Sequence, residues 1–121
     1  MRYMCIVHVD PAVWPKLSEA ERAEIDRSSM AYDQELQRNG NYIVAEIVEG
    51  PESATLVRVR NGQQATTDGP YMETKEHMAG FILIEARDMN DAIRLAAGIP
   101  LAALGTIEIR AIYTIPTPPE L

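Results

Sequence analysis

The sequence predicts an α+β fold in which two β-α-β units are separated by a β-hairpin. Residues 3–9 are apolar on both alternating sets of side chains, which is typical of a strand buried on both faces. Ser18, followed three residues later by Glu21, forms a capping box of the kind that begins a helix. Asn61-Gly62 lies between two alternating segments and is a strong hairpin signal. These three observations predict the fold class.

The first unit is a strand, a helix and a second strand. We place these elements at residues 3–9, 19–38 and 42–49. Pro11 interrupts the first strand, because proline cannot donate to a strand ladder. Asn39-Gly40 is a typical left-handed helix stop, and Gly50-Pro51 ends the second strand.

The hairpin and the second unit follow. We place the two hairpin strands, a buried strand, the second helix and the last strand at 54–60, 63–67, 81–85, 88–99 and 106–115. Asp88 can cap that helix, and Gly98 and Pro100 mark its end. The order is that of a ferredoxin-like antiparallel sheet, βαβ-hairpin-βαβ, with two helices on one face.

The predicted sheet needs a cover on its second face. Two helices can cover only one face, yet residues 3–9 and 81–85 are apolar on both. A second copy of the chain, laid sheet to sheet, would supply the missing apolar surface. We therefore expect a homodimer.

Length and composition exclude several classes of protein. A chain of 121 residues predicts one domain, which we place at 1–116 with a loose tail at 117–121. A net charge of -7, without a basic run, argues against nucleic acid as a partner. The single cysteine, Cys5, cannot form a disulfide within the chain, and no long apolar segment predicts a membrane span. We expect a cytoplasmic protein.

Dedicated cofactor motifs are absent from the sequence. It contains no glycine-rich phosphate loop, no H-E-x-x-H pattern and no EF-hand spacing, so we expect neither a metal nor another cofactor. The serines of the first helix lack a G-x-S-x-G elbow, which argues against a serine hydrolase.

Asp68 and His8 are the candidate catalytic residues. Asp68 opens an Asp-Gly-Pro turn, where a carboxylate can act as a general base or orient a histidine. The same carboxylate can instead accept hydrogen bonds from the amides of its own turn. His8 lies in the first strand as either a hydrogen-bonded core group or, beside a carboxylate, a proton-transfer group. We expect any activity to depend on Asp68 and on His8 in preference to His77.

A charged segment after this turn supplies the candidate ligand-binding residues. Residues 73–77 can form a short exposed helix whose charges are merely solvated. Alternatively, Tyr71, Lys75 and His77 bind a ligand, with Tyr71 and Lys75 bordering a cleft and holding an anionic or carbonyl group.

Five segments carry a family pattern: RYMCIVHVD, VRVRNGQQATTDGPY, ETKEHMAGFILIEA, DMNDAIRLAAGIP and GTIEIRAIY. Together they resemble the DGPF-domain, YCII-related proteins over nearly the whole chain. The resemblance implies a dimeric α+β barrel, a fold shared with muconolactone isomerase-like enzymes, and an association with extracytoplasmic-function sigma factors. The chain departs from the pattern in two places: DGPF is DGPY here, and the stretch that usually reads ETKEQLGGF carries His77 and Met78. A His-Asp dyad has been proposed in some relatives, but the motif places that histidine on neither His8 nor His77.

Two functions are compatible with these residues. The first is a cofactor-independent acid-base enzyme acting on a small organic substrate, aromatic-derived or lactone-like. The second is a non-catalytic module that binds a small ligand or a regulatory partner such as a sigma factor. A histidine paired with a carboxylate in a concave pocket would favour the enzyme.

Overall fold

The computed structural model describes residues 1–118, and residues 119–121 of the predicted tail lie outside the described part. The α-helices and strands are β1 (Arg2–Val9), α1 (Glu19–Arg38), β2 (Tyr42–Ile47), β3 (Thr55–Arg60), β4 (Gln63–Asp68), β5 (His77–Glu85), α2 (Met89–Ala96) and β6 (Thr106–Ala111). Short 3-10 turns cover Trp14–Lys16, Pro51–Ser53 and Pro100–Ala103. Within the described part, no helix has the length and apolar character needed to cross a membrane.

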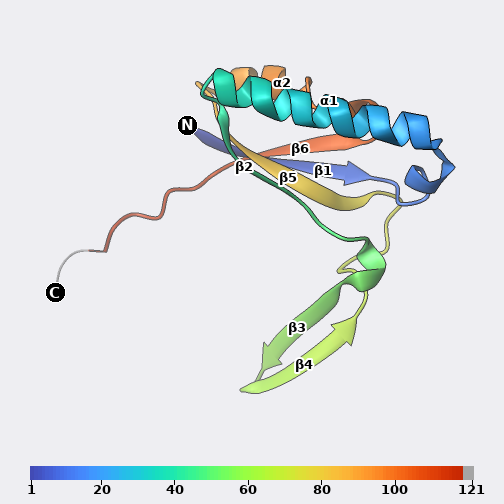
Figure 1. Ribbon diagram of the computed structural model, residues 1–121. Helices are drawn as coiled ribbons and strands as arrows, with labels where there is room; N and C mark the ends of the chain where they lie inside the picture. Colours follow the sequence, from blue (N-terminus) through green and yellow to red (C-terminus); the bar gives the residue numbers. More distant parts are fainter. Residues whose placement is uncertain (119–121) are drawn as a thin grey trace.

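Four strands form the main sheet in the order β2-β5-β1-β6, and every neighbouring pair is antiparallel. The first strand of each β-α-β unit therefore lies in the centre, which is the ferredoxin-like arrangement predicted from the sequence. Strands β3 and β4 pair only with each other. Both helices lie on one face of the sheet, while the hairpin projects away on the other side (Figure 1).

The core lies between the sheet and the two helices. Side chains at alternate positions of β1 and β5 are buried there together with residues of both helices: Tyr3, Cys5, Val7, Ile82, Ile84, Leu36, Ala92, Leu95 and Ala96. Burial raises the pKa of the Cys5 thiol to about 11. Cys5 is therefore a protonated core residue at neutral pH.

The opposite face of the sheet is open in the single chain. It carries the other alternating set, which includes Met4, Ile6 and His8 of β1 together with Phe81 and Leu83 of β5. These side chains are half-buried, since only their neighbours in the sheet cover them. The prediction of apolar residues on both faces of the central strands is confirmed.

Helix α1 begins and ends where the sequence predicts. The Ser18 Oγ accepts a hydrogen bond from the Glu21 amide at 3.1 Å, and the Ser18 amide donates to Glu21 Oε1 at 3.0 Å. These bonds hold the pKa of Glu21 below its ordinary value. At the other end, Gly40 adopts a φ of 74°, the left-handed conformation of a helix stop.

Several other boundaries were predicted wrongly. Strand β5 starts at His77, four residues before the predicted Phe81, so residues 73–77 do not form a helix. The pairing of β5 with β1 and β2 decides where β5 begins. Glycine at position 80 permits the close contact between β5 and β2, because a Cβ there would lie 2.5 Å from the Glu46 carbonyl oxygen. Helix α2 stops at Ala96, β2 at Ile47 and β6 at Ala111, all earlier than predicted.

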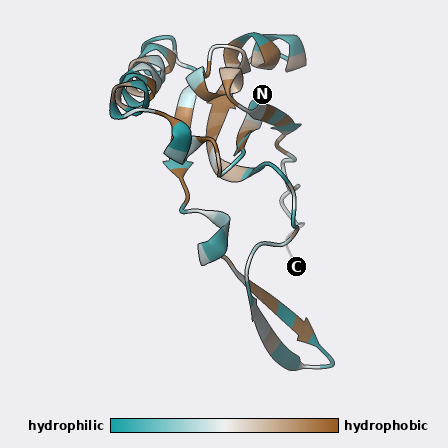
Figure 2. Ribbon diagram, turned by 90° about the vertical axis from the view of Figure 1, so that its right-hand side faces the viewer, coloured by the Kyte–Doolittle hydropathy of each residue, from teal (hydrophilic) through white to brown (hydrophobic). Residues whose placement is uncertain are grey.

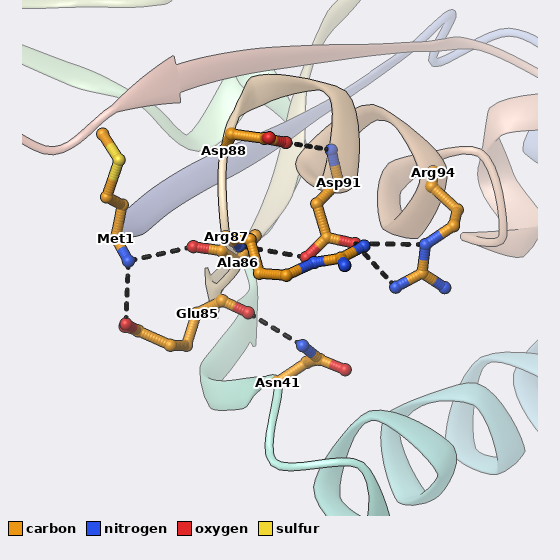
Figure 3. A network of polar contacts seen from close by, with 8 residues as sticks. All are labelled: Met1, Asn41, Glu85, Ala86, Arg87, Asp88, Asp91 and Arg94. Atoms are coloured by element: carbon orange, nitrogen blue, oxygen red, sulfur yellow. Dashed lines mark hydrogen bonds and ion pairs between the residues drawn. The ribbon is translucent and has the colours of Figure 1, made fainter.

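Asp91 is the most strongly bonded carboxylate of the helical layer (Figure 3). Its side chain is 4% exposed, and Oδ2 accepts from the Arg87 amide at 3.0 Å. Its Oδ1 accepts from Nη2 of Arg87 at 3.2 Å and of Arg94 at 2.7 Å. The Asp91 amide donates in turn to the Asp88 Oδ1, which caps α2. The bonds from Arg87 and then Arg94 hold the pKa of Asp91 well below its ordinary value.

The hairpin turn contains two neighbouring residues with positive φ. Asn61 and Gly62 adopt φ values of 53° and 74°, as a type I′ turn requires. We expect Gly62→Val to weaken the hairpin by about 1–2 kcal/mol, because a β-branched residue is strained in this conformation. Amide hydrogen exchange should quicken in β3 and β4 and stay unchanged in β1 and β5. Unchanged exchange in the hairpin would contradict the turn assignment.

We expect the contribution of Asp91 to the free energy of unfolding to depend on pH. Because its pKa lies below the ordinary value of 3.8 in the folded protein, its ionised form stabilises the fold above that pH and loses its effect as the pH falls further. Asp91→Asn should lower the urea midpoint of unfolding at neutral pH. The difference in midpoint between this variant and the parent protein should shrink below about pH 4. Asp26→Asn, an exposed change on α1, is the matched control. A difference that is independent of pH would contradict this role.

Candidate functional site

An open pocket of about 1120 Å³ lies at one end of the uncovered sheet face. Its lining comes from strands β1, β5 and β6 and from the two segments that connect the hairpin to the sheet: His8, Val48, Glu49, Gly50, Pro51, Ser53, Ala54, Pro70, Tyr71, Met72, Thr74, Glu76, His77, Met78, Thr106 and Glu108. Small-molecule sites in proteins have this character: a concave, mostly apolar lining with a few polar groups.

His8 reaches the pocket because of the register of β1. It lies opposite Met78 of β5 and Thr106 of β6, two residues beyond Ile6 on the open face. The β1–β5 register shifts between Val7 and His8, a bulge of the kind that re-aims side chains at the end of a strand.

His8 is paired with a carboxylate. Its Nε2 lies 2.9 Å from Oε1 of Glu108, and the two side chains are 28% and 48% exposed. When the carboxylate is ionised and the imidazole is neutral, Nε2 carries the ring proton and donates a hydrogen bond to Glu108. An ionised carboxylate can only accept hydrogen bonds. The other ring nitrogen, Nδ1, is then unprotonated and able to accept a proton.

A second polar contact ties the segment before β5 to β6. The Thr106 hydroxyl donates to Oε1 of Glu76 at 2.8 Å, and the Thr74 hydroxyl donates to the Glu76 carbonyl oxygen. These bonds hold residues 74–76 across the end of β6, beside the His8–Glu108 pair. Thr74, Glu76 and His77 line the pocket, so this segment, for which a merely solvated face was one of two alternatives, forms one wall of it.

The structure brings together three of the five residues that the sequence singled out. His8, Tyr71 and His77 line the pocket, and His77 lies opposite Val9 as the first residue of β5. Lys75 is exposed and does not line it. Asp68 is exposed at the end of β4, opposite Thr55, and is not part of the lining either.

The carboxylate beside His8 is therefore Glu108, not Asp68 as the sequence suggested. Glu108 belongs to the polar set of the last strand, which was visible in the sequence as an alternation with Ile107 and Ile109. That alternation places it on the open face. Its approach to His8 depends on how β1 pairs with β6. Thr106 joins the site through the same pairing, and Glu76 joins it through its hydrogen bond with Thr106.

The fold and the motifs agree with one family. The YCII-related domain model matches residues 1–116. The chain belongs to the YCII-related family. It is also 30% identical, over 113 residues, to an uncharacterized protein of Rhizobium meliloti (strain 1021), a match that covers 91% of this chain and 90% of that protein. Three departures from the family pattern, Tyr71, His77 and Met78, thus lie in the pocket of this YCII-related protein.

Candidate metal ligands are not grouped together in the described part of this YCII-related domain. Within residues 1–118, no three histidine, cysteine or acidic side chains are grouped so that they could hold a metal ion. Four of the polar residues of the pocket form two hydrogen-bonded pairs, His8 with Glu108 and Thr106 with Glu76. Such pairs are suited to proton transfer and to orienting a ligand.

Proposed function

We propose that this YCII-related protein is a cofactor-independent enzyme that transfers protons on a small organic substrate, with His8 as the acid-base group. The pairing of His8 with Glu108 at the wall of a largely apolar pocket carries this proposal. A carboxylate that accepts from one ring nitrogen fixes the tautomer of the imidazole and stabilises the cation that forms when the other nitrogen takes a proton.

The proposed reaction needs no group besides this pair. Nδ1 of His8 removes a proton from a carbon or oxygen of the substrate, and the resulting imidazolium is held by Glu108. The imidazolium then returns a proton to another atom of the substrate, so that the net reaction is an isomerisation. Because the pair is partly exposed, the Nδ1 proton exchanges with solvent before its return, and heavy water labels the substrate. The apolar residues around the pair would bind the organic part of the substrate.

The proposal predicts which substitutions remove activity. Proton exchange into heavy water by a panel of lactones and aromatic ketones can be followed by proton NMR without knowledge of the natural substrate. His8→Gln should reduce catalysed exchange by about 100-fold or more, and Glu108→Gln by about tenfold or more. Asp68→Asn is the matched carboxylate control, and its effect also tests the role expected for Asp68 from the sequence.

Two results would contradict this assignment. Exchange that survives both His8→Gln and Glu108→Gln would remove the pair from the chemistry. Ligand binding without exchange in any compound would favour the second function considered above, a small-ligand-binding or regulatory module.

We further propose that the protein acts as a homodimer. The open sheet face is apolar at its centre, and Val44 on β2 lies opposite Leu83, where it extends this surface. The hairpin exposes Val57 and Val59, whose side chains are 62% and 59% accessible. Figure 2 shows hydrophobic residues along this arm, well away from the core. A two-stranded hairpin alone is marginally stable in water, so both surfaces favour a second copy as cover.

If the protein is a dimer, sedimentation at micromolar concentration should give a mass of about twice the 13.5 kDa of one chain. Val44→Lys should shift the protein to the monomer, because a charge on the open face would be buried against the partner. Ile93→Lys, on an exposed position of α2, is the matched control and should leave the dimer intact. A parent protein that sediments as a monomer and does not bind the dye ANS would contradict the proposal.

A further inference from the structure

We propose that the ligand of this pocket is an organic cation, an apolar molecule that carries an amine. The inference builds on the proposed function, because it names the chemical class of molecule that the same pocket selects. It differs from the expectation drawn from the sequence, in which Lys75 and Tyr71 were to hold an anionic or carbonyl group.

The charged residues of the pocket are all acidic. Glu49, Glu76 and Glu108 line it, and among residues 1–118 no lysine or arginine belongs to the lining. The basic groups among the described residues that line it are His8 and His77. A carboxylate or phosphate ligand would therefore meet three like charges and no permanent cation, whereas an ammonium group would meet three possible partners.

The three carboxylates are only partly compensated. Glu108 is bonded to His8, and Glu76 accepts from the uncharged hydroxyl of Thr106. Glu49 takes part in no ion pair within the part of the chain that the structure describes. The pocket thus keeps negative charge, and the net charge of -7 on the whole chain adds an attraction for cations and a repulsion for anions.

The remaining lining suits the organic part of such a molecule. Most of the other side chains are apolar or aromatic: Val48, Pro51, Ala54, Pro70, Tyr71, Met72 and Met78. Methionine side chains adapt to ligands of varied shape, and the face of a tyrosine ring attracts an ammonium group. Inorganic cations gain nothing from these groups, so the pocket favours an amine with a hydrocarbon or aromatic body.

Three probes of similar shape test this selectivity. They are 2-phenylethylamine, 2-phenylethanol and phenylacetate, which are cationic, neutral and anionic at neutral pH. Binding to the full chain is followed through the NMR signals of the Met72 and Met78 methyl groups. We expect the amine to bind about tenfold or more tightly than phenylacetate, with the alcohol between them, and the difference to shrink in high salt.

A matched pair of variants locates the selectivity. Glu49→Gln removes the unpaired carboxylate and should reduce the preference for the amine about threefold or more. Glu35→Gln removes an exposed carboxylate from α1, on the other face of the sheet, and should leave the preference unchanged. An equal effect of both variants would mean that only the overall charge of the protein matters, and would overturn the inference.

Other outcomes separate this inference from the proposed enzyme. Phenylacetate binding as tightly as the amine, or no shift of the two methyl signals with millimolar amine, would overturn the inference even if lactones or ketones undergo catalysed exchange. Amine-selective binding without any proton exchange would support the inference and contradict the proposed enzyme.

Discussion

The register of β1 between β5 and β6 is the constraint on which both the core and the candidate site depend. Since side chains alternate along a strand, one register places Tyr3, Cys5 and Val7 under the helices and His8 on the open face. The pairing with β6 brings Glu108 to 2.9 Å from His8. A slip of one residue would turn His8 toward the helices, and the buried set would face the pocket.

The inserted hairpin contributes to the pocket through its connections rather than through its strands. The segments at 48–54 and 70–76 line the pocket, whereas no residue of β3 or β4 does. The same insertion leaves the hairpin as an arm outside the core, with exposed valines. One feature of the chain thus encloses the site and, on the proposed dimer, offers surface to a second copy.

The helical layer is anchored by polar contacts at one end of the sheet. Helix α2 has eight residues and would be marginal alone. Asp88 caps it, and Asp91 binds Arg87, which precedes the helix, and Arg94 of its last turn. Nearby, the side-chain amide of Asn41 donates to the Glu85 carbonyl oxygen, which joins the start of β2 to the end of β5 (Figure 3). The candidate site lies elsewhere and shares none of these groups.

The sequence by itself determined the fold class, both ends of α1 and the hairpin turn, because capping boxes, left-handed stops and Asn-Gly turns act within a few residues. It also marked His8, Tyr71 and His77, which line the pocket. Only the tertiary structure decided where β5 begins and β6 ends, since strand limits depend on the pairing of distant segments. The tertiary structure alone also selected Glu108 over Asp68 as the partner of His8. His8 and Glu108 lie 100 positions apart in the sequence and meet only through strand register.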